Sequence, residues 1–320
     1  MTENDFESGS ASVVKGGVDG GVDAPARADD RAEENVLVEG ELLLRGRRLR
    51  FAQAGSTASP PLVLLHGTAF DLHQWTRVAP ALARDFRVIA LDAPGHGASE
   101  GSAHFGDAID AFARATLDLI AALGVERVAI VAHSFGAAAA VRIAIERPEF
   151  VSRIVLVSLL THLAPARWSE RLARSPVFAA TMPLRWLRAR TLRAHRGADV
   201  EADREASPRG WSSLLADDPT ARASLRALVD VRADRMLEAH LPRLRTPTAL
   251  VFGRHDPLVP AGLGQRLARQ ANAERLHLLD CAHVPELSAP RDLVETIRPF
   301  LLGPVASPRV TKAPRLGSSE

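Results

Sequence analysis

The chain is poor in the residues on which several classes of protein depend. Only one of its 320 residues, Cys281, is a cysteine. A single thiol excludes an intrachain disulfide and argues against a cysteine-based metal site. No run of about 18 apolar residues is present to span a bilayer. The first residues, Met1–Asp5, lack the basic start and apolar core of a secretory signal. We therefore expect a cytoplasmic protein that does not associate with membranes.

Neither sign of charge dominates. Forty lysines and arginines nearly balance 38 aspartates and glutamates, which leaves a net charge of +2. The basic residues are spread along the chain, so the sequence does not indicate a nucleic-acid-binding surface. With 46% apolar residues, a chain of this length can bury a large core, as one domain or as a domain with an insertion.

Both ends of the chain are poor in large apolar residues. We expect residues 1–35 to be a disordered tail and residues 304–320 to be a flexible one, because neither can bury enough surface to offset the entropy of ordering. Between them, short apolar runs alternate with helical patterns. This alternation predicts an α/β protein with a mostly parallel sheet and helices on both faces.

The predicted elements follow one another from Val36 to Leu302. They are a hairpin (Val36–Leu44 and Arg48–Ala54), six strands (Leu62–Leu65, Phe86–Leu91, Val128–Val131, Ile154–Val157, Ala249–Phe252 and Leu276–Leu279) and five helices (Leu72–Ala83, Ala108–Leu123, Phe135–Glu146, Ala261–Gln270 and Arg291–Leu302).

One long segment interrupts the alternation. Residues 159–244 read as all-helical and rich in arginine, so we predict a helical cap inserted between two parts of a core, 36–158 and 245–303. The expected place for the cap is over the carboxyl edge of the sheet, where the active sites of such folds lie.

The segment Ala132–Gly136 (Ala-His-Ser-Phe-Gly) lies between a predicted strand and a predicted helix. A serine hydroxyl becomes a nucleophile when it has an adjacent base and an exposed, strained position, and a tight strand-to-helix turn supplies that position. Ala132 stands where the usual pattern, G-x-S-x-G, has its first glycine. Ser134 is thus a candidate nucleophile; the alternative is an ordinary serine capping a helix.

Three further segments lie, like the serine turn, at or directly after the end of a predicted strand. They are Leu64–Thr68 (Leu-Leu-His-Gly-Thr), Gly253–Pro260 and Asp280–Glu286. Together with the serine turn, they make the region from Leu62 to Leu302 resemble the α/β-hydrolase fold with a helical cap.

The resemblance implies a role for each segment. Ser134 would be the nucleophile, Asp256 the acid and His283 the general base of a catalytic triad, in the chain order of this family. The backbone N–H groups of Thr68 and Phe135 would form the oxyanion hole. The alternatives are a turn-forming Asp256 and a loop histidine at His283.

Other positions are expected to serve the architecture. The family has a competing position for the triad acid near Ser158, and this chain has no carboxylate there. We expect Cys281 to be a buried filler, and His66 to brace its loop. The glycine-rich segment Asp92–Ser99 is a family marker, so Asp92 and His96 are interpreted as structural, as is His133.

The cap segment holds three of the four tryptophans, Trp168, Trp186 and Trp211. They are candidates for lining an apolar substrate pocket, and the alternative is that they pack the cap onto the core. The arginine-rich stretch Met182–Arg196 could meet an anionic lipid or an acidic substrate group. Acidic residues follow it at once, so a solvated face is favoured.

These observations predict a serine hydrolase that cleaves a carboxylic ester, or a related acyl bond, of a small and apolar substrate. The route requires neither a metal nor an organic cofactor. A cofactor-free peroxidase or a carbon–carbon-bond hydrolase would use the same triad, although the latter often has tryptophan where this chain has Val284. A binding protein that kept the fold without turnover is the remaining alternative. The sequence carries no signal for an oligomeric state.

Overall fold

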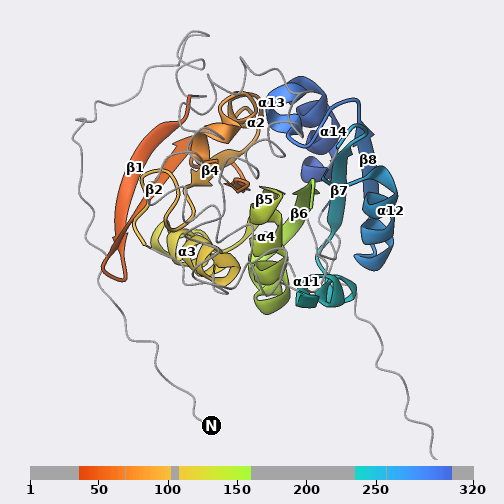
Figure 1. Ribbon diagram of the computed structural model, residues 1–320. Helices are drawn as coiled ribbons and strands as arrows, with labels where there is room; N and C mark the ends of the chain where they lie inside the picture. Colours follow the sequence, from red (N-terminus) through yellow and green to blue (C-terminus); the bar gives the residue numbers. More distant parts are fainter. Residues whose placement is uncertain (1–35, 69, 102–107, 160–234, 257, 305–320) are drawn as a thin grey trace, which may run out of the picture.

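The computed structural model describes residues 36–68, 70–101, 108–159, 235–256 and 258–304. Within these ranges eight strands form one sheet in the order β1-β2-β4-β3-β5-β6-β7-β8, with helices packed against it (Figure 1). The strands are β1 (Val38–Leu44), β2 (Arg47–Ala54), β3 (Pro61–Leu65), β4 (Arg87–Leu91), β5 (Val128–His133), β6 (Val151–Val157), β7 (Thr248–Gly253) and β8 (Arg275–Leu279).

The sheet is parallel from β4 to β8, and β2 is antiparallel to both of its neighbours. The predicted hairpin is β1 and β2, joined by Arg45 and Gly46, whose φ angles are 49° and 71°. Two successive residues with positive φ match the turn that suits the twist of a hairpin. The interior strands β5 and β7 are buried along their whole length. Their sequences are continuously apolar because helices cover both faces of a parallel sheet and shield both sets of side chains from water.

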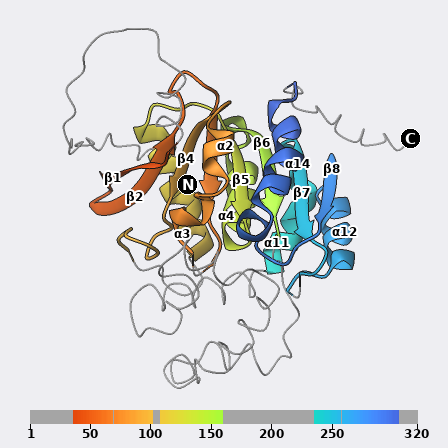
Figure 2. The same ribbon diagram turned by 90° about the horizontal axis from the view of Figure 1, so that it is seen from above.

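Two helical layers enclose the sheet. The helical segments are η1 (Leu72–Trp75), α2 (Ala79–Leu82), α3 (Ala108–Ala122), α4 (Phe135–Glu146), η2 (Pro148–Phe150), α11 (Arg235–His240), η3 (Leu241–Arg243), α12 (Ala261–Gln270), α13 (Pro285–Ser288) and α14 (Pro290–Leu302). Helices α3, α4, α11 and α12 share one apolar cluster with one face of the sheet, whereas α2 and α14 share another with the opposite face (Figure 2).

One predicted helix is divided. The segment Leu72–Ala83 forms the 3-10 turn η1 and the short helix α2 instead of a continuous helix. Pro80 explains the break, since a proline inside a helix lacks an N–H and its ring clashes with the carbonyl four residues earlier. Pro80 is tolerated where it lies, in the first turn of α2. The one-turn helix α13, between β8 and α14, was not predicted.

Most of the predicted cap lies outside the described residues, and so do Trp168, Trp186, Trp211 and the stretch Met182–Arg196. The tail 1–35 and residues 305–320 are outside them as well. The last part of the predicted cap segment is described, and there α11 and η3 bury Leu237 and Leu241 in the apolar cluster that contains α4. The domain boundaries therefore stay predictions.

No helix within the described ranges combines the length and the hydropathy needed to cross a bilayer. The predicted cytoplasmic location stays a prediction.

Candidate active site

The predicted serine turn has the strained geometry expected of it. Ser134 lies between β5 and α4 with a φ of 48° and a ψ of −106°, a conformation that a non-glycine residue rarely adopts. It stands at the N-cap position, but its hydroxyl makes no capping bond to α4, a helix whose residues are all described. The hydroxyl is therefore available to another partner, next to the positive end of the helix dipole.

The residues around the turn explain why it is so tight. A Cβ atom on Gly136 would lie 2.5 Å from the carbonyl oxygen of Leu65 and 2.6 Å from that of His66. Glycine is required there for α4 to pack against the end of β3. Ala132 is a regular residue of β5 paired with Leu65, so its methyl group needs no unusual backbone and the departure from the usual pattern is accommodated.

The structure brings Ser134, His283 and Asp256 together. The Nε2 atom of His283 lies 3.4 Å from Oγ of Ser134, and its Nδ1 atom lies 2.7 Å from Oδ2 of Asp256. All three residues are at most 5% exposed. The distance to the serine is at the long end for a hydrogen bond. A hydroxyl, an imidazole and a carboxylate in contact in this order are able to act as nucleophile, base and orienting group.

The carboxylate of Asp256 is held on both oxygens. Its Oδ1 atom accepts hydrogen bonds from the backbone N–H groups of Leu258, at 2.7 Å, and of Val259, at 2.9 Å. Its Oδ2 atom is left for His283. Such bonds fix the orientation of the carboxylate.

Backbone contacts join the loop after β7 to the loop after β8. The N–H groups of Arg254 and His255 donate to the carbonyl oxygens of Leu279, at 2.8 Å, and of Cys281, at 3.0 Å. Gly253 permits this approach, since a Cβ atom there would lie 2.0 Å from the carbonyl oxygen of Ala282. The spacing between Asp256 and His283 is therefore set by main-chain packing.

Thr68 and Phe135 lie at the same edge of the sheet as Ser134. Thr68 follows β3 and Phe135 begins α4, and β3 pairs with β5. The Phe135 ring stacks on Phe112 and His96, with centroid distances of 5.4 and 5.7 Å. The backbone N–H groups of Thr68 and Phe135 come from the two segments next to the serine. Donors to an oxyanion formed at Ser134 would have to lie there.

His66 braces the Thr68 loop, as expected from the sequence. Its Nε2 atom accepts from the N–H of Ala93 at 2.9 Å, so its Nδ1 atom carries the hydrogen and donates to the carbonyl of Gly67 at 2.8 Å. Burial lowers the pKa of His66 to about 4. The ring is therefore neutral near pH 7, as this pair of bonds requires.

Comparison with known proteins identifies the family. A family model described as the alpha/beta hydrolase fold matches residues 60–290. The chain belongs to the α/β-hydrolase fold family. The chain is also 30% identical over 240 residues to the pimeloyl-[acyl-carrier protein] methyl ester esterase of Nitrosomonas europaea, covering 73% of this chain and 93% of that protein.

Other relatives agree. A putative carbamate hydrolase, RutD, of Stutzerimonas stutzeri is 28% identical over 69% of this chain and 83% of its own. A solved structure of a hydrolase from Pseudomonas aeruginosa PA01 is 27% identical, with a TM-score of 0.69, and the match covers 83% of this chain and 98% of that one. The predicted fold class is confirmed, and so is the prediction of a hydrolase of this fold.

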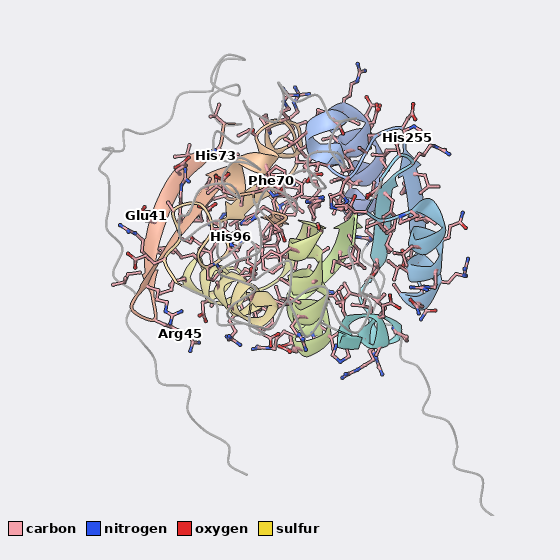
Figure 3. The ribbon with its side chains drawn as sticks, in the orientation of Figure 1. Glu41, Arg45, Phe70, His73, His96 and His255 are labelled. Carbon is pink, nitrogen blue, oxygen red and sulfur yellow. The ribbon has the colours of Figure 1, made fainter. Side chains whose placement is uncertain are left out.

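The glycine-rich segment after β4 serves the architecture of this α/β hydrolase. Asp92 is fully buried and accepts from the N–H groups of Leu72 and Ala98, both at 2.8 Å. Burial, reinforced by the neighbouring charge of Asp71, raises the pKa of Asp92 to about 6. Burial also lowers the pKa of His96 to about 3. Figure 3 shows His96 and Phe70 near the middle of the molecule, whereas His255 lies at its periphery.

Cys281 and Ser158 fit the predicted secondary roles in the hydrolase. Cys281 is 7% exposed, and burial raises the pKa of its thiol to about 11, so the sulfur is protonated near pH 7 and is a poor nucleophile. Ser158, at the tip of β6, is fully buried with a φ of 46°. The competing position for a triad acid is thus occupied by a hydroxyl.

Two residues near the site of the hydrolase were not found from the sequence. Gln74 in η1 and Glu286 in α13 are fully buried and meet behind His133, the residue before Ser134. A lone glutamine and a lone glutamate in short helical segments carry no motif. Their significance depends on contacts between segments more than 200 positions apart.

Proposed function

We propose that this α/β hydrolase is a serine hydrolase that cleaves a carboxylic ester of a small, apolar substrate. The observation that carries the proposal is the unbroken chain of contacts from Ser134 Oγ through His283 to Asp256, at 3.4 and 2.7 Å. Each member is of the residue type that its role needs, and each is held by a different loop at one edge of the sheet.

Acylation would begin at Ser134. The Oγ atom attacks the carbonyl carbon of the ester while His283 Nε2 takes the hydroxyl proton. The carbonyl oxygen becomes an oxyanion, which the N–H groups of Thr68 and Phe135 stabilise. Donors of this kind are worth about 3 to 4 kcal/mol each in related chemistry. The tetrahedral intermediate then collapses, and His283 returns the proton to the departing alcohol.

Deacylation would repeat the same steps with water. His283 takes a proton from a water molecule that attacks the acyl-enzyme, and the acid leaves as Ser134 recovers its proton. Asp256 Oδ2 holds the Nδ1–H of His283, which presents Nε2 to the serine and stabilises the imidazolium. Every proton transfer in this route is carried by His283, so the cycle needs no cofactor.

Two observations support the substrate class. Phe70, Val284 and Leu287 form a separate buried apolar cluster, which lies between the Thr68 loop and the residues that follow His283. Apolar side chains next to the proposed base favour an apolar substrate group over a charged one. The similarity to a methyl ester esterase supports an ester as the scissile bond. Trp168, Trp186 and Trp211 remain proposed contacts of the substrate.

A fluorophosphonate probe tests the proposal, together with hydrolysis of p-nitrophenyl esters of graded acyl length. Wild-type protein is expected to label covalently and to hydrolyse the short esters, and Ser134→Ala is expected to do neither. Ser288→Ala removes a hydroxyl that donates to the carbonyl of Val284 and provides a serine control. Equal labelling of wild type and Ser134→Ala, or turnover that requires added peroxide, would contradict the proposal.

A further inference from the structure

Behind the proposed triad lies a second group of buried polar side chains. Gln74 and Glu286 are fully buried and His133 is 1% exposed. The Nε2 atom of Gln74 donates to Oε1 of Glu286 and lies 2.9 Å from Nδ1 of His133. The Nδ1 atom of His133 is 3.3 Å from the same glutamate oxygen. Three segments distant in the sequence therefore meet at one point.

The partners of these side chains determine which atom donates. The Oε1 atom of Gln74 accepts the N–H of Gly67 at 2.8 Å, which fixes the orientation of the amide. The Nε2 atom of His133 lies 3.0 Å from the backbone carbonyl of His283; since a carbonyl only accepts, this nitrogen carries the hydrogen. One amide hydrogen of Gln74 is then directed to Oε1 of Glu286, and the same amide nitrogen contacts Nδ1 of His133.

The group touches all three parts of the proposed catalytic machinery. Gln74 holds the N–H of Gly67, directly before Thr68. His133 directly precedes Ser134 and holds the backbone of His283. The ring of His133 also packs on Gly67 so closely that a Cβ atom there would lie 2.3 Å from Nδ1. A buried network of polar side chains that contacts several segments favours one arrangement of those segments over others.

We propose that Gln74, His133 and Glu286 are positioning residues that set the spacing between the oxyanion-hole loop, the nucleophile and the base. The inference rests on the proposed serine hydrolase function. None of the three would touch the reacting atoms. They act by holding the main chain at Gly67 and His283, so their loss should affect the transition state more than substrate binding.

The sharpest test is the near-isosteric variant Gln74→Glu. It keeps an acceptor for Gly67 but replaces the N–H₂ group that serves Glu286 and His133 with an oxygen. We expect kcat for p-nitrophenyl acetate to fall by about 10- to 100-fold, as for misplacements of up to 1 Å, with little change in KM. The exchange variant Gln74→Glu/Glu286→Gln restores an amide–carboxylate pair and should recover part of kcat.

A second readout does not depend on turnover. The short contact between His283 Nδ1 and Asp256 should give a downfield proton resonance in the NMR spectrum, and this resonance should shift in Gln74→Glu and return toward its wild-type position in the exchange variant. If wild type shows no Ser134-dependent hydrolysis, the proposed function fails and this resonance alone decides the positioning role.

Thr248→Val is the matched control for lost stability. It removes a buried hydrogen bond, from Thr248 Oγ1 to the carbonyl of Thr246, at the opposite end of the sheet. It should lower the melting temperature and leave kcat and the resonance unchanged. Folded Gln74→Glu with wild-type kcat and resonance would overturn the proposal. If Gln74→Glu does not fold, the exchange variant decides: a wild-type resonance there supports the network, and a shifted one overturns it.

Discussion

Replacement of Gly253 by alanine should separate the proposed acid from the proposed base. The new Cβ atom would lie 2.0 Å from the carbonyl oxygen of Ala282 and 2.4 Å from that of Cys281. Both obstacles are main chain, so neither can rotate away. One of the two loops must retreat by about 1.4 Å to reach the 3.4 Å at which ordinary contact begins.

The displaced segments carry the two residues whose spacing matters. Ala282 directly precedes His283, and Gly253 lies three positions before Asp256. A misplacement of about 1 Å is enough to cost about 100-fold in rate, which corresponds to about 2.7 kcal/mol of activation free energy. Overpacking should also lower the free energy of unfolding by about 1 to 3 kcal/mol. We therefore expect kcat/KM for a p-nitrophenyl ester to fall about 100-fold.

Gly262→Ala is the matched control. A Cβ atom at Gly262, in α12, would meet nothing within 4 Å, and alanine in a helix is favoured over glycine by about 0.5 to 1 kcal/mol. Urea denaturation should show a small gain in stability with unchanged kcat/KM. If folded Gly253→Ala hydrolysed esters at the wild-type rate, main-chain packing would not be what sets the acid–base spacing.

Three further outcomes follow from the buried groups. Asp256→Asn should lower kcat about 10³- to 10⁴-fold, because an amide favours the wrong tautomer of His283; near-normal steady-state rates would remove Asp256 from the triad. The pKa of His96 is about 3 in the folded protein, against a reference value of 6.5. Between these two pH values the unfolded state binds more protons than the folded state. The free energy of unfolding should therefore decrease as the pH falls from 6.5 toward 3, by up to about 1.4 kcal/mol per pH unit. Urea midpoints of His96→Leu should fall less steeply across this window, and a slope equal to that of wild type would refute the assignment. Because burial raises the pKa of the Cys281 thiol to about 11, iodoacetamide at pH 7.5 should neither modify the folded protein nor inhibit it, and rapid alkylation seen by mass spectrometry would show that the thiol is accessible.

Strand ends were the part of the site that could be read from the sequence. Apolar runs such as Val128–Val131 identify buried strands, and the polar residues that follow them all reach the same edge of a parallel sheet. The resemblance of these segments to the α/β-hydrolase fold then implied Ser134, Asp256 and His283 as candidates, although 122 and 27 positions separate them. The helix predicted over Leu72–Ala83 is broken in the structure, because the helical spacing of apolar residues continues past Pro80 although the helix itself cannot.

The sequence by itself determined the family, the order of the strands along the chain and which side chains are candidates for the chemistry, because these depend on local patterns and on residue type. Tertiary structure decided the distances between those side chains, the close approach at Gly136 and Gly253, and the meeting of Gln74 with Glu286, 212 positions away. Such contacts arise from the packing of segments that share no local signal. For that reason the network behind Ser134 became visible only in the folded chain.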